Sequence, residues 1–199
     1  MTQGAPMQFV APEDTARANL YGLVARLFYA APDAQLISEL INSPAIEGDG
    51  ELAAAWREMV AAGANAFPAA LEAEHMEIFI GTGRAPVTPY LSHYVLKHAN
   101  DAPLVELRSQ LNAWGIARRE GVAEYEDHIS GVCETMRFAI AVQQRTPEEQ
   151  KVFFERFIYR GAIGLCDAVS ASNQARFYRL VARFARAFFE VEKVAFEIV

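Results

Sequence analysis

The sequence predicts an all-α fold, a compact bundle of several helices joined by short connections. Apolar residues recur at helical spacing in most segments, and prolines and glycines separate those segments from one another. No segment shows the apolar–polar alternation that is typical of a strand. With 199 residues, 52% of them hydrophobic and 22% charged, the chain can bury a full core, and we expect a single domain over residues 1–199.

The first half of the chain divides into four predicted helices. Pro12, with two acids directly after it, suits a first helical turn, because proline is tolerated there and acids face the positive end of the helix. Pro32 ends this helix. Further helices are predicted at 34–42, 51–63 and 67–80.

The second half continues the pattern. Helices are predicted at 90–98, at 102–114 and, as a long element, at 124–144, with a possible hinge near 115–123 between two glycines. Thr146-Pro147-Glu148-Glu149 reads as a capping box that starts the next helix. Ser172 is predicted to cap the last helix. An apolar stripe there, interpreted as core, consists of Phe177, Leu180, Val181, Phe184 and Phe188.

The charge and the cysteines narrow the class of protein. A net charge of −7 argues against nucleic-acid binding, which needs a basic face. Cys133 and Cys166 lie far apart in apolar helical surroundings and are predicted to be buried thiols in a reducing compartment. Neither a secretory signal nor a run of about 20 apolar residues is present, so we expect a cytoplasmic protein without stable membrane insertion.

Motifs for catalysis and cofactor binding are incomplete. The four histidines, His75, His93, His98 and His128, form no metal-ligand spacing, so no metal or other cofactor is predicted. Gly81-Thr82-Gly83 lacks the strand and lysine of a phosphate loop and is interpreted as a helix end. Ser92 has no nucleophile elbow around it, and no catalytic residue is predicted. A nucleotide-dependent switch or a hydrolase that uses residues 81–94 remains the alternative function.

Two segments carry a more specific pattern, EHMEIFIGTGRAPVTPYLSHY at 74–94 and EYEDHISGVCETMRF at 124–138. The first resembles an acid-led helix, a glycine turn and the motif P-aromatic-x-S-x-Y, and the second resembles an x-D-H-I helix start. Both motifs are those of the TorD/DmsD-like redox-enzyme maturation chaperones. Residues 17–40, RANLYGLVARLFYAAPDAQLISEL, and the closing ARFYRLVARFARAFFEVE resemble the ends of the same family.

The resemblance implies an all-helical, cytoplasmic chaperone and not an enzyme. Such a chaperone binds an apo-molybdoenzyme subunit, usually through its twin-arginine leader peptide, and holds back export until the molybdenum cofactor is inserted. Monomers and domain-swapped homodimers both occur in the family, and guanine-nucleotide binding has been proposed for some members. A scaffold that binds the mature enzyme and not the leader is a further possibility.

The resemblance also implies which residues bind the peptide and that the two segments meet in space. The residues that match the family's motifs are Glu74, Phe79, Gly81, Pro89, Tyr90, Ser92, Tyr94, Asp127, His128 and Ile129. The predicted peptide-binding residues are Phe79, Pro89, Tyr90, Ser92, Tyr94, Asp127 and His128. The chain departs from the pattern at Thr82, His75, Glu77, Tyr125 and residues 159–163.

Chemistry gives these residues two readings each. A twin-arginine leader needs carboxylates beside an apolar groove, and Asp127 lies at a predicted helix start, where it could serve only as the cap or also bind. His128 could be structural or could tie the two segments together. Tyr90 and Tyr94 would share one face of a 90–98 helix, as an aromatic platform or as packing over the core.

Overall fold

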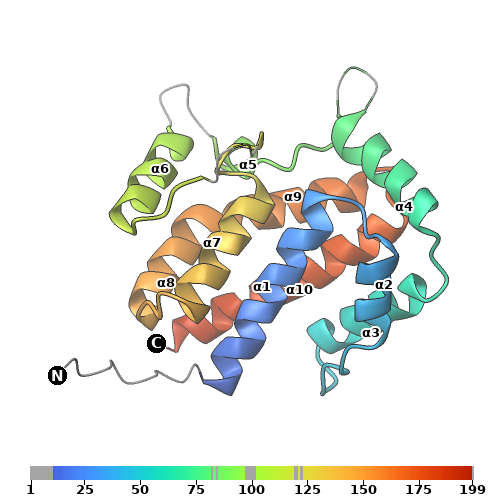
Figure 1. Ribbon diagram of the computed structural model, residues 1–199, viewed down its shortest axis with the longest axis horizontal. Coiled ribbons are helices and arrows are strands. Elements are labelled where there is room, and N and C mark those ends of the chain that lie inside the picture. Colours follow the sequence, from blue (N-terminus) through green and yellow to red (C-terminus); the bar gives the residue numbers. More distant parts are fainter. Residues whose placement is uncertain are drawn as a thin grey trace.

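The computed structural model describes residues 11–81, 83, 85–96, 102–118, 121 and 123–198, and these residues are mostly helical (Figure 1). The predicted all-α class is confirmed, since the described residues form helices and no β-strand. The β-type pairing among them is an isolated bridge between Tyr90 and His128. The helices are α1 Pro12–Tyr29, α2 Ala34–Ile41, α3 Glu51–Gly63, α4 Pro68–His75, η1 Met76–Ile80, α5 Ser92–Val95, α6 Pro103–Ala113, α7 Ile129–Ala141, α8 Pro147–Phe153, η2 Phe154–Tyr159, α9 Arg160–Ala171 and α10 Phe177–Glu197.

The helices surround α10, the longest of them. It packs against α9 and against α3, while α1 and α7 pair along most of their lengths. In Figure 1, α4 and α6 lie at opposite ends of the upper edge, and α5 with its flanking segments lies between them. This upper edge holds both segments that the sequence singled out.

Two helical stretches contain a π-helical turn. One runs without a break from α4 into η1, which agrees with the predicted helix at 67–80, and the other runs from α8 through η2 into α9. Because a π turn holds an extra residue, it shifts the side chains that follow it around the helix axis. The second π turn carries Arg156 and Phe157, which face α6.

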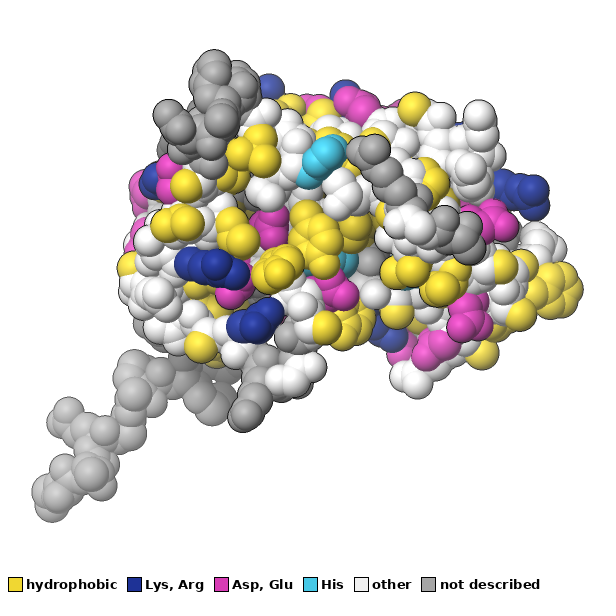
Figure 2. All heavy atoms as spheres, turned by 90° about the horizontal axis from the view of Figure 1, so that it is seen from above, with side chains coloured by type: hydrophobic (Ala, Val, Ile, Leu, Met, Phe, Trp, Pro, Cys, Tyr) yellow, Lys and Arg dark blue, Asp and Glu magenta, His cyan; other side chains and the backbone are white. Residues whose placement is uncertain are grey.

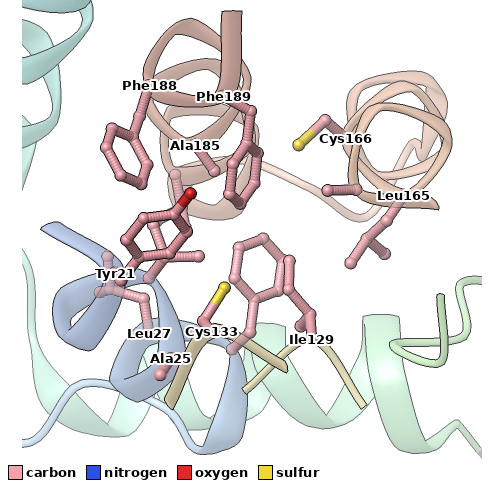
Figure 3. Packing of buried hydrophobic residues seen from close by; sticks show 14 of the residues in the cluster. Tyr21, Ala25, Leu27, Ile129, Cys133, Leu165, Cys166, Ala185, Phe188 and Phe189 are labelled. Atoms are coloured by element: carbon pink, nitrogen blue, oxygen red, sulfur yellow. The ribbon is translucent and has the colours of Figure 1, made fainter. Parts of the chain in front are cut away.

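The core lies between α1, α7, α9 and α10 (Figure 3). Tyr21 of α1 meets Phe188 of α10 edge to face, with ring centroids 4.8 Å apart. Cys133 and Cys166 are both buried and free, as predicted, and burial raises the pKa of both thiols, that of Cys166 to about 12. The predicted stripe of the last helix is buried except for Leu180, which is partly buried.

The helix that starts at residue 147 is capped as predicted. The Thr146 hydroxyl accepts a hydrogen bond from the Glu149 N–H at 3.3 Å, and the Glu149 carboxylate accepts from the Thr146 N–H at 3.1 Å. This reciprocal pair satisfies two N–H groups that the helix itself leaves free.

The predicted cap of the last helix is wrong. The helix begins at Phe177 and not beside Ser172, whose hydroxyl bonds to Gln174 in the preceding turn. The carboxylate of Glu74, on α4, instead accepts from three successive N–H groups, at 2.8, 3.2 and 2.8 Å. These groups belong to Arg176, Phe177 and Tyr178. A carboxylate at a helix N-terminus also meets the positive end of the helix dipole.

A buried ion pair joins the two terminal helices. The guanidinium of Arg17 bonds both oxygens of Glu192 at 2.8 and 2.9 Å, and the Tyr21 hydroxyl donates to the same carboxylate at 2.9 Å. Arg17 also donates to Asp14 and to Gln150. Glu192 is only 2% exposed, so these partners supply the hydrogen bonds that water would otherwise provide.

Two predictions about domain organisation remain, the single domain and the hinge, and part of the hinge lies outside the described residues. One hydrophobic cluster draws residues from α1 through to α10, while the predicted hinge near 115–123 includes residues 119, 120 and 122, which are not described. No helix in the described part of the chain is both long and apolar enough to cross a membrane.

Candidate functional site

The two singled-out segments meet at the upper edge of the molecule. The Leu91 N–H donates to the Asp127 carbonyl at 2.9 Å, and the Ile129 N–H donates to the Pro89 carbonyl at 3.0 Å. Tyr90 and His128 face each other in this short antiparallel bridge. Pro89 has no N–H, so the bridge uses only its carbonyl. The predicted proximity of the segments is therefore present in the structure.

The bridge also moves the start of α7. A helix was predicted from Glu124, but α7 begins at Ile129. The Asp127 carbonyl and the Ile129 N–H pair with residues 89–91, and the His128 N–H donates to the Tyr125 carbonyl in a turn. The N-cap is His128 and not Asp127. Its Nδ1 accepts from the Ser130 N–H at 3.1 Å and lies 2.6 Å from the Ser130 hydroxyl. An Nδ1 that accepts from a backbone N–H carries no proton, and burial lowers the pKa of His128.

Asp127 is turned inward. Its side chain is nearly buried, at 6% exposure, and the Ser92 hydroxyl donates to its carboxylate. The reading of Asp127 as the helix cap is thus overturned, and the carboxylate instead joins α5 to the start of α7. Since Ser92 gives its proton to Asp127, it is not paired with a histidine as a nucleophile would be.

Tyr90 forms the centre of a group of rings. Its ring lies edge to face with His128, at 5.4 Å between centroids, and 6.0 Å from the ring of Tyr125, which is 56% exposed. The Tyr90 hydroxyl donates to the Glu124 carboxylate. Burial and this hydrogen bond raise the pKa of Tyr90, so the hydroxyl keeps its proton. Tyr125, a departure from the family pattern, is the exposed member of the group.

The predicted pairing of Tyr90 with Tyr94 is wrong. The helix α5 spans only Ser92–Val95, and Tyr90 lies before it in the bridge. Tyr94 instead donates its hydroxyl to the Thr88 carbonyl at 2.8 Å, and burial raises its pKa to about 12. Its ring lines an open depression of about 540 Å³ between the 85–88 stretch, α5 and Ala168 of α9.

The segment before and within α5 is seated on two glycines of α9. A Cβ added to Gly161 would lie 2.7 Å from the Leu91 Cβ and 2.8 Å from the Leu91 carbonyl oxygen. A Cβ added to Gly164 would lie 2.7 Å from the Tyr94 Cβ. Because real Cβ atoms do not approach so closely, only glycine permits this contact.

Phe79 does not join the surface. It is 6% exposed and packs edge to face with Phe28 and Tyr178, at 5.9 and 5.2 Å between centroids. His75 lies against the same cluster, and its buried Nε2 has no hydrogen-bond partner. Burial lowers the pKa of His75, so the ring is neutral near pH 7. Phe79 therefore belongs to the core and not to the exposed surface of the site.

Charged residues surround the exposed rings. Figure 2, which looks onto this face, shows hydrophobic side chains at its centre with acidic and basic side chains beside them. Arg108 of α6 donates two hydrogen bonds to one oxygen of Glu126, at 3.1 and 3.0 Å, and Arg118 donates to the Glu124 carbonyl at 3.1 Å. Burial alone would raise the pKa of Glu126, but the bond from Arg108, a backbone hydrogen bond and the charges of Arg108 and Arg118 together outweigh burial, and the pKa is lowered.

The glycines at 81 and 83 end a helix. Gly81 has φ of 64°, and its N–H donates to the Met76 carbonyl at 2.7 Å, as a helix end requires. Gly83 also has positive φ, at 105°, while Thr82 and Arg84 lie outside the described residues. In the described part of the chain, no group of three or more possible metal ligands lies together.

Sequence reasoning missed one side chain and one contact of this site. Arg108 lies within a predicted helix, where nothing distinguishes it from a solvated surface residue, and the partner of Glu124 is a tyrosine 34 positions earlier. Neither contact leaves a signal in local sequence, because each joins segments that are distant along the chain.

Comparison with known proteins identifies relatives of the fold and of the sequence. The model of the nitrate reductase delta subunit family matches residues 46–190. A solved structure, of a candidate redox enzyme maturation protein from Archaeoglobus fulgidus, is similar with a TM-score of 0.58 and 17% sequence identity, over 94% of this chain and 99% of that one. A search of curated proteins gives no match.

Proposed function

Because the chain belongs to the nitrate reductase delta subunit family, whose members are TorD-type maturation chaperones, we propose that it binds an apo-molybdoenzyme subunit through a twin-arginine leader peptide. It holds that subunit until the molybdenum cofactor has been inserted, before export or assembly. Cofactor insertion takes place in the cytoplasm in this proposal, and the chaperone acts as a monomer or as a domain-swapped homodimer.

The family assignment also bears on the alternative functions, a hydrolase or a nucleotide-dependent switch. It is a family of maturation chaperones and not of catalytic enzymes, which confirms the prediction that the chain is not an enzyme. The geometry of Ser92 and of Gly81 agrees with that assignment, since the first donates to a buried carboxylate and the second ends a helix. We therefore do not retain the hydrolase or nucleotide switch.

One observation supports the peptide site above all others. Glu124 and Glu126 flank Tyr125, whose ring is 56% exposed, in the segment that leads into the bridge between 89–91 and 127–129. The third carboxylate, that of Asp127, is turned inward. Guanidinium groups bind carboxylates through paired hydrogen bonds and stack on aromatic faces. A leader with two adjacent arginines would place one over Tyr125 and direct the other to Glu124 or Glu126.

The predicted residues then have unequal roles. Tyr90, with its hydroxyl on Glu124, orients an acid that the leader would use. His128, neutral and bonded to Ser130, fixes the turn that presents the acids, and Pro89 holds the opposite strand of the bridge. Asp127 and Ser92 lie deeper, and Tyr94 lies on the α9 side, so we assign these three to positioning the surface.

Titration calorimetry with a synthetic leader peptide tests the proposal. The peptide carries two adjacent arginines and a following apolar stretch, and a second peptide carries lysines in their place. We expect Tyr125→Ala to bind the arginine peptide about three- to tenfold more weakly, because it loses stacking and apolar contact. The lysine peptide should bind wild type less tightly, since lysine makes no paired bonds.

Phe67→Ala is the matched control, because Phe67 is also an exposed aromatic residue, at 76%, but lies before α4, away from the bridge. Its affinity for the leader should equal that of wild type. If Tyr125→Ala and Phe67→Ala bind alike, the surface is wrongly placed. If wild type itself fails to bind the leader, the proposed function is wrong.

A further inference from the structure

The helix α6 covers a narrow crevice beside the candidate site. The crevice has a volume of about 20 Å³, room for about one water molecule, and Asp127 and Ser92 provide polar atoms in its wall. The rest of its wall is mostly apolar, except for Arg156 from η2. The other lining residues are Leu91, Val95, Pro103, Leu107 and Phe157. A carboxylate beside an apolar wall is thus present, but closed off by α6.

Two ion pairs hold α6 over this crevice. On one side Arg108 bonds Glu126, and on the other Arg156 of η2 donates to Glu106 at 2.9 and 3.3 Å. Residues 106 and 108 are two apart, about 200° around a helix, so the pairs lie on opposite flanks of α6. Arg108 is 44% exposed and Glu126 16%, and both partners of the second pair are about half exposed. Pairs that water reaches in this way contribute less free energy than fully buried pairs, so they break more readily.

The C-terminal end of α6 is held differently. Trp114 stacks on Phe153 of α8, with ring centroids 4.9 Å apart and an interplanar angle of 27°. The Gln143 side chain donates to the Trp114 carbonyl at 2.8 Å, and the Arg145 guanidinium lies over the Trp114 ring. This end is therefore a firm attachment about which the rest of α6 can move.

We propose that α6 is a lid over an arginine-binding subsite, and that Arg108 occupies Glu126 in the place of a leader arginine. This inference rests on the proposed function. When the lid opens about its Trp114 end, Glu126 loses Arg108, and Asp127 becomes accessible between Leu91 and Phe157. The leader's guanidinium takes the carboxylates, and its apolar stretch packs against the uncovered wall.

The lid gives the chaperone two properties. Without a client, the apolar wall is covered and does not offer a surface for unspecific association. With a client, each leader arginine must displace an internal one, so the apparent affinity is the affinity of the open state multiplied by the fraction of molecules that are open. Release after cofactor insertion is then easier than from a permanently open groove.

The experiment breaks the same ion pair from either side. We expect Arg108→Gln to bind the twin-arginine leader about two- to fivefold more tightly than wild type, because the internal competitor is gone. Glu126→Gln also frees the lid but removes the acid, so it should bind more weakly. Hydrogen exchange of the amides of α6 should be faster in both variants.

Matched variants control for the changes in charge. Arg26 and Glu39 form an ion pair between α1 and α2, 49% and 43% exposed, and Arg26→Gln and Glu39→Gln change the net charge by the same amounts as the two test variants. The affinities of these two control variants for the leader peptide measure the effect of the change in charge alone. The lid is refuted if Arg108→Gln binds the leader no tighter than Arg26→Gln, or if hydrogen exchange of the α6 amides is unchanged. In that case, binding of the leader by wild type still supports the proposed function. If no variant binds the leader, both proposals fail.

Discussion

Glu192 and Glu126 each accept two hydrogen bonds from one arginine side chain, but they lie in different parts of the molecule. Glu192 is buried among α1, α8 and α10, and both of its oxygens are bonded to Arg17, with Tyr21 as a third donor. Glu126 lies at the upper edge, and a single oxygen takes both bonds from Arg108, which is nearly half exposed. One type of ion pair thus occurs in two very different environments.

The difference shows how burial decides what a salt bridge does. A buried carboxylate cannot lose its partner without a large cost of desolvation, so the Arg17–Glu192 pair fixes how the first and last helices cross. Glu126 is also mostly buried, at 16% exposure, but Arg108 is 44% exposed, so water reaches the Arg108–Glu126 pair and the exchange of one guanidinium for another costs less. Stability therefore depends on the buried region, and we propose that binding depends on the other.

The largest effect is expected at the buried pair. Arg17→Ala leaves Glu192 charged and unpaired, and should lower the free energy of unfolding by about 3–5 kcal/mol. Urea denaturation followed by circular dichroism measures this change. Replacing both residues together, Arg17→Met with Glu192→Leu, should recover most of the loss. A single variant as stable as wild type would show that the buried pair does not hold the helices.

The next effect concerns Glu74, the cap supplied from α4. Glu74→Ala removes three hydrogen bonds from the start of α10 and should cost about 2 kcal/mol, again by denaturation. Ser172→Ala, at the position predicted from sequence, should cost less, about 0.5 kcal/mol. Equal losses in the two variants would contradict the assignment of the cap to Glu74.

A smaller effect depends on pH. Burial lowers the pKa of both His75 and His128 below the ordinary value of 6.5. The unfolded chain therefore binds protons first as the pH falls, and stability that is present above about pH 6.5 is lost as the pH drops through the lowered values. His75→Phe should reduce the loss in unfolding free energy between pH 7 and pH 5. His93→Phe, at an exposed ring, is the control, and an equal slope in both would refute the role of His75.

The smallest effect on stability is expected at the site pair. Arg108→Gln should change the free energy of unfolding by less than about 1 kcal/mol, although it changes leader affinity. The same denaturation series as for Arg17 measures it. A loss comparable to that of Arg17→Ala would mean that the two pairs are alike, and the contrast between the regions would fail.

The fold could largely be predicted because its signals are local. The apolar stripe of the last helix and the capping box at Thr146 each involve residues within a few turns of one another, so their spacing is visible in the sequence. The cap of α10 was missed because Glu74 lies about 100 positions before the N–H groups that it bonds. Local preference pointed to Ser172 and could not register a distant carboxylate.

The site could be predicted only in part for the same reason. Asp127 is a preferred capping residue, yet Ser92 across the bridge draws its carboxylate inward and leaves the cap to His128. Tyr90 and Tyr94 have helical spacing, but the bridge takes Tyr90 out of the helix. Phe79 matched a family motif, and the motif did not reveal that the residue lies in the core. The resemblance located the segments, while tertiary contacts assigned the roles.

The two glycines of α9 beneath Leu91 and Tyr94 have a consequence for redesign. The absence of a Cβ at these two positions determines how closely residues 91–94 approach α9, independently of the side chains that the segment exposes. The two glycines and the exposed residues can therefore be altered separately. Redesign of the proposed peptide site for another client would vary Tyr125, Glu124 and Glu126 and would keep Gly161 and Gly164 unchanged.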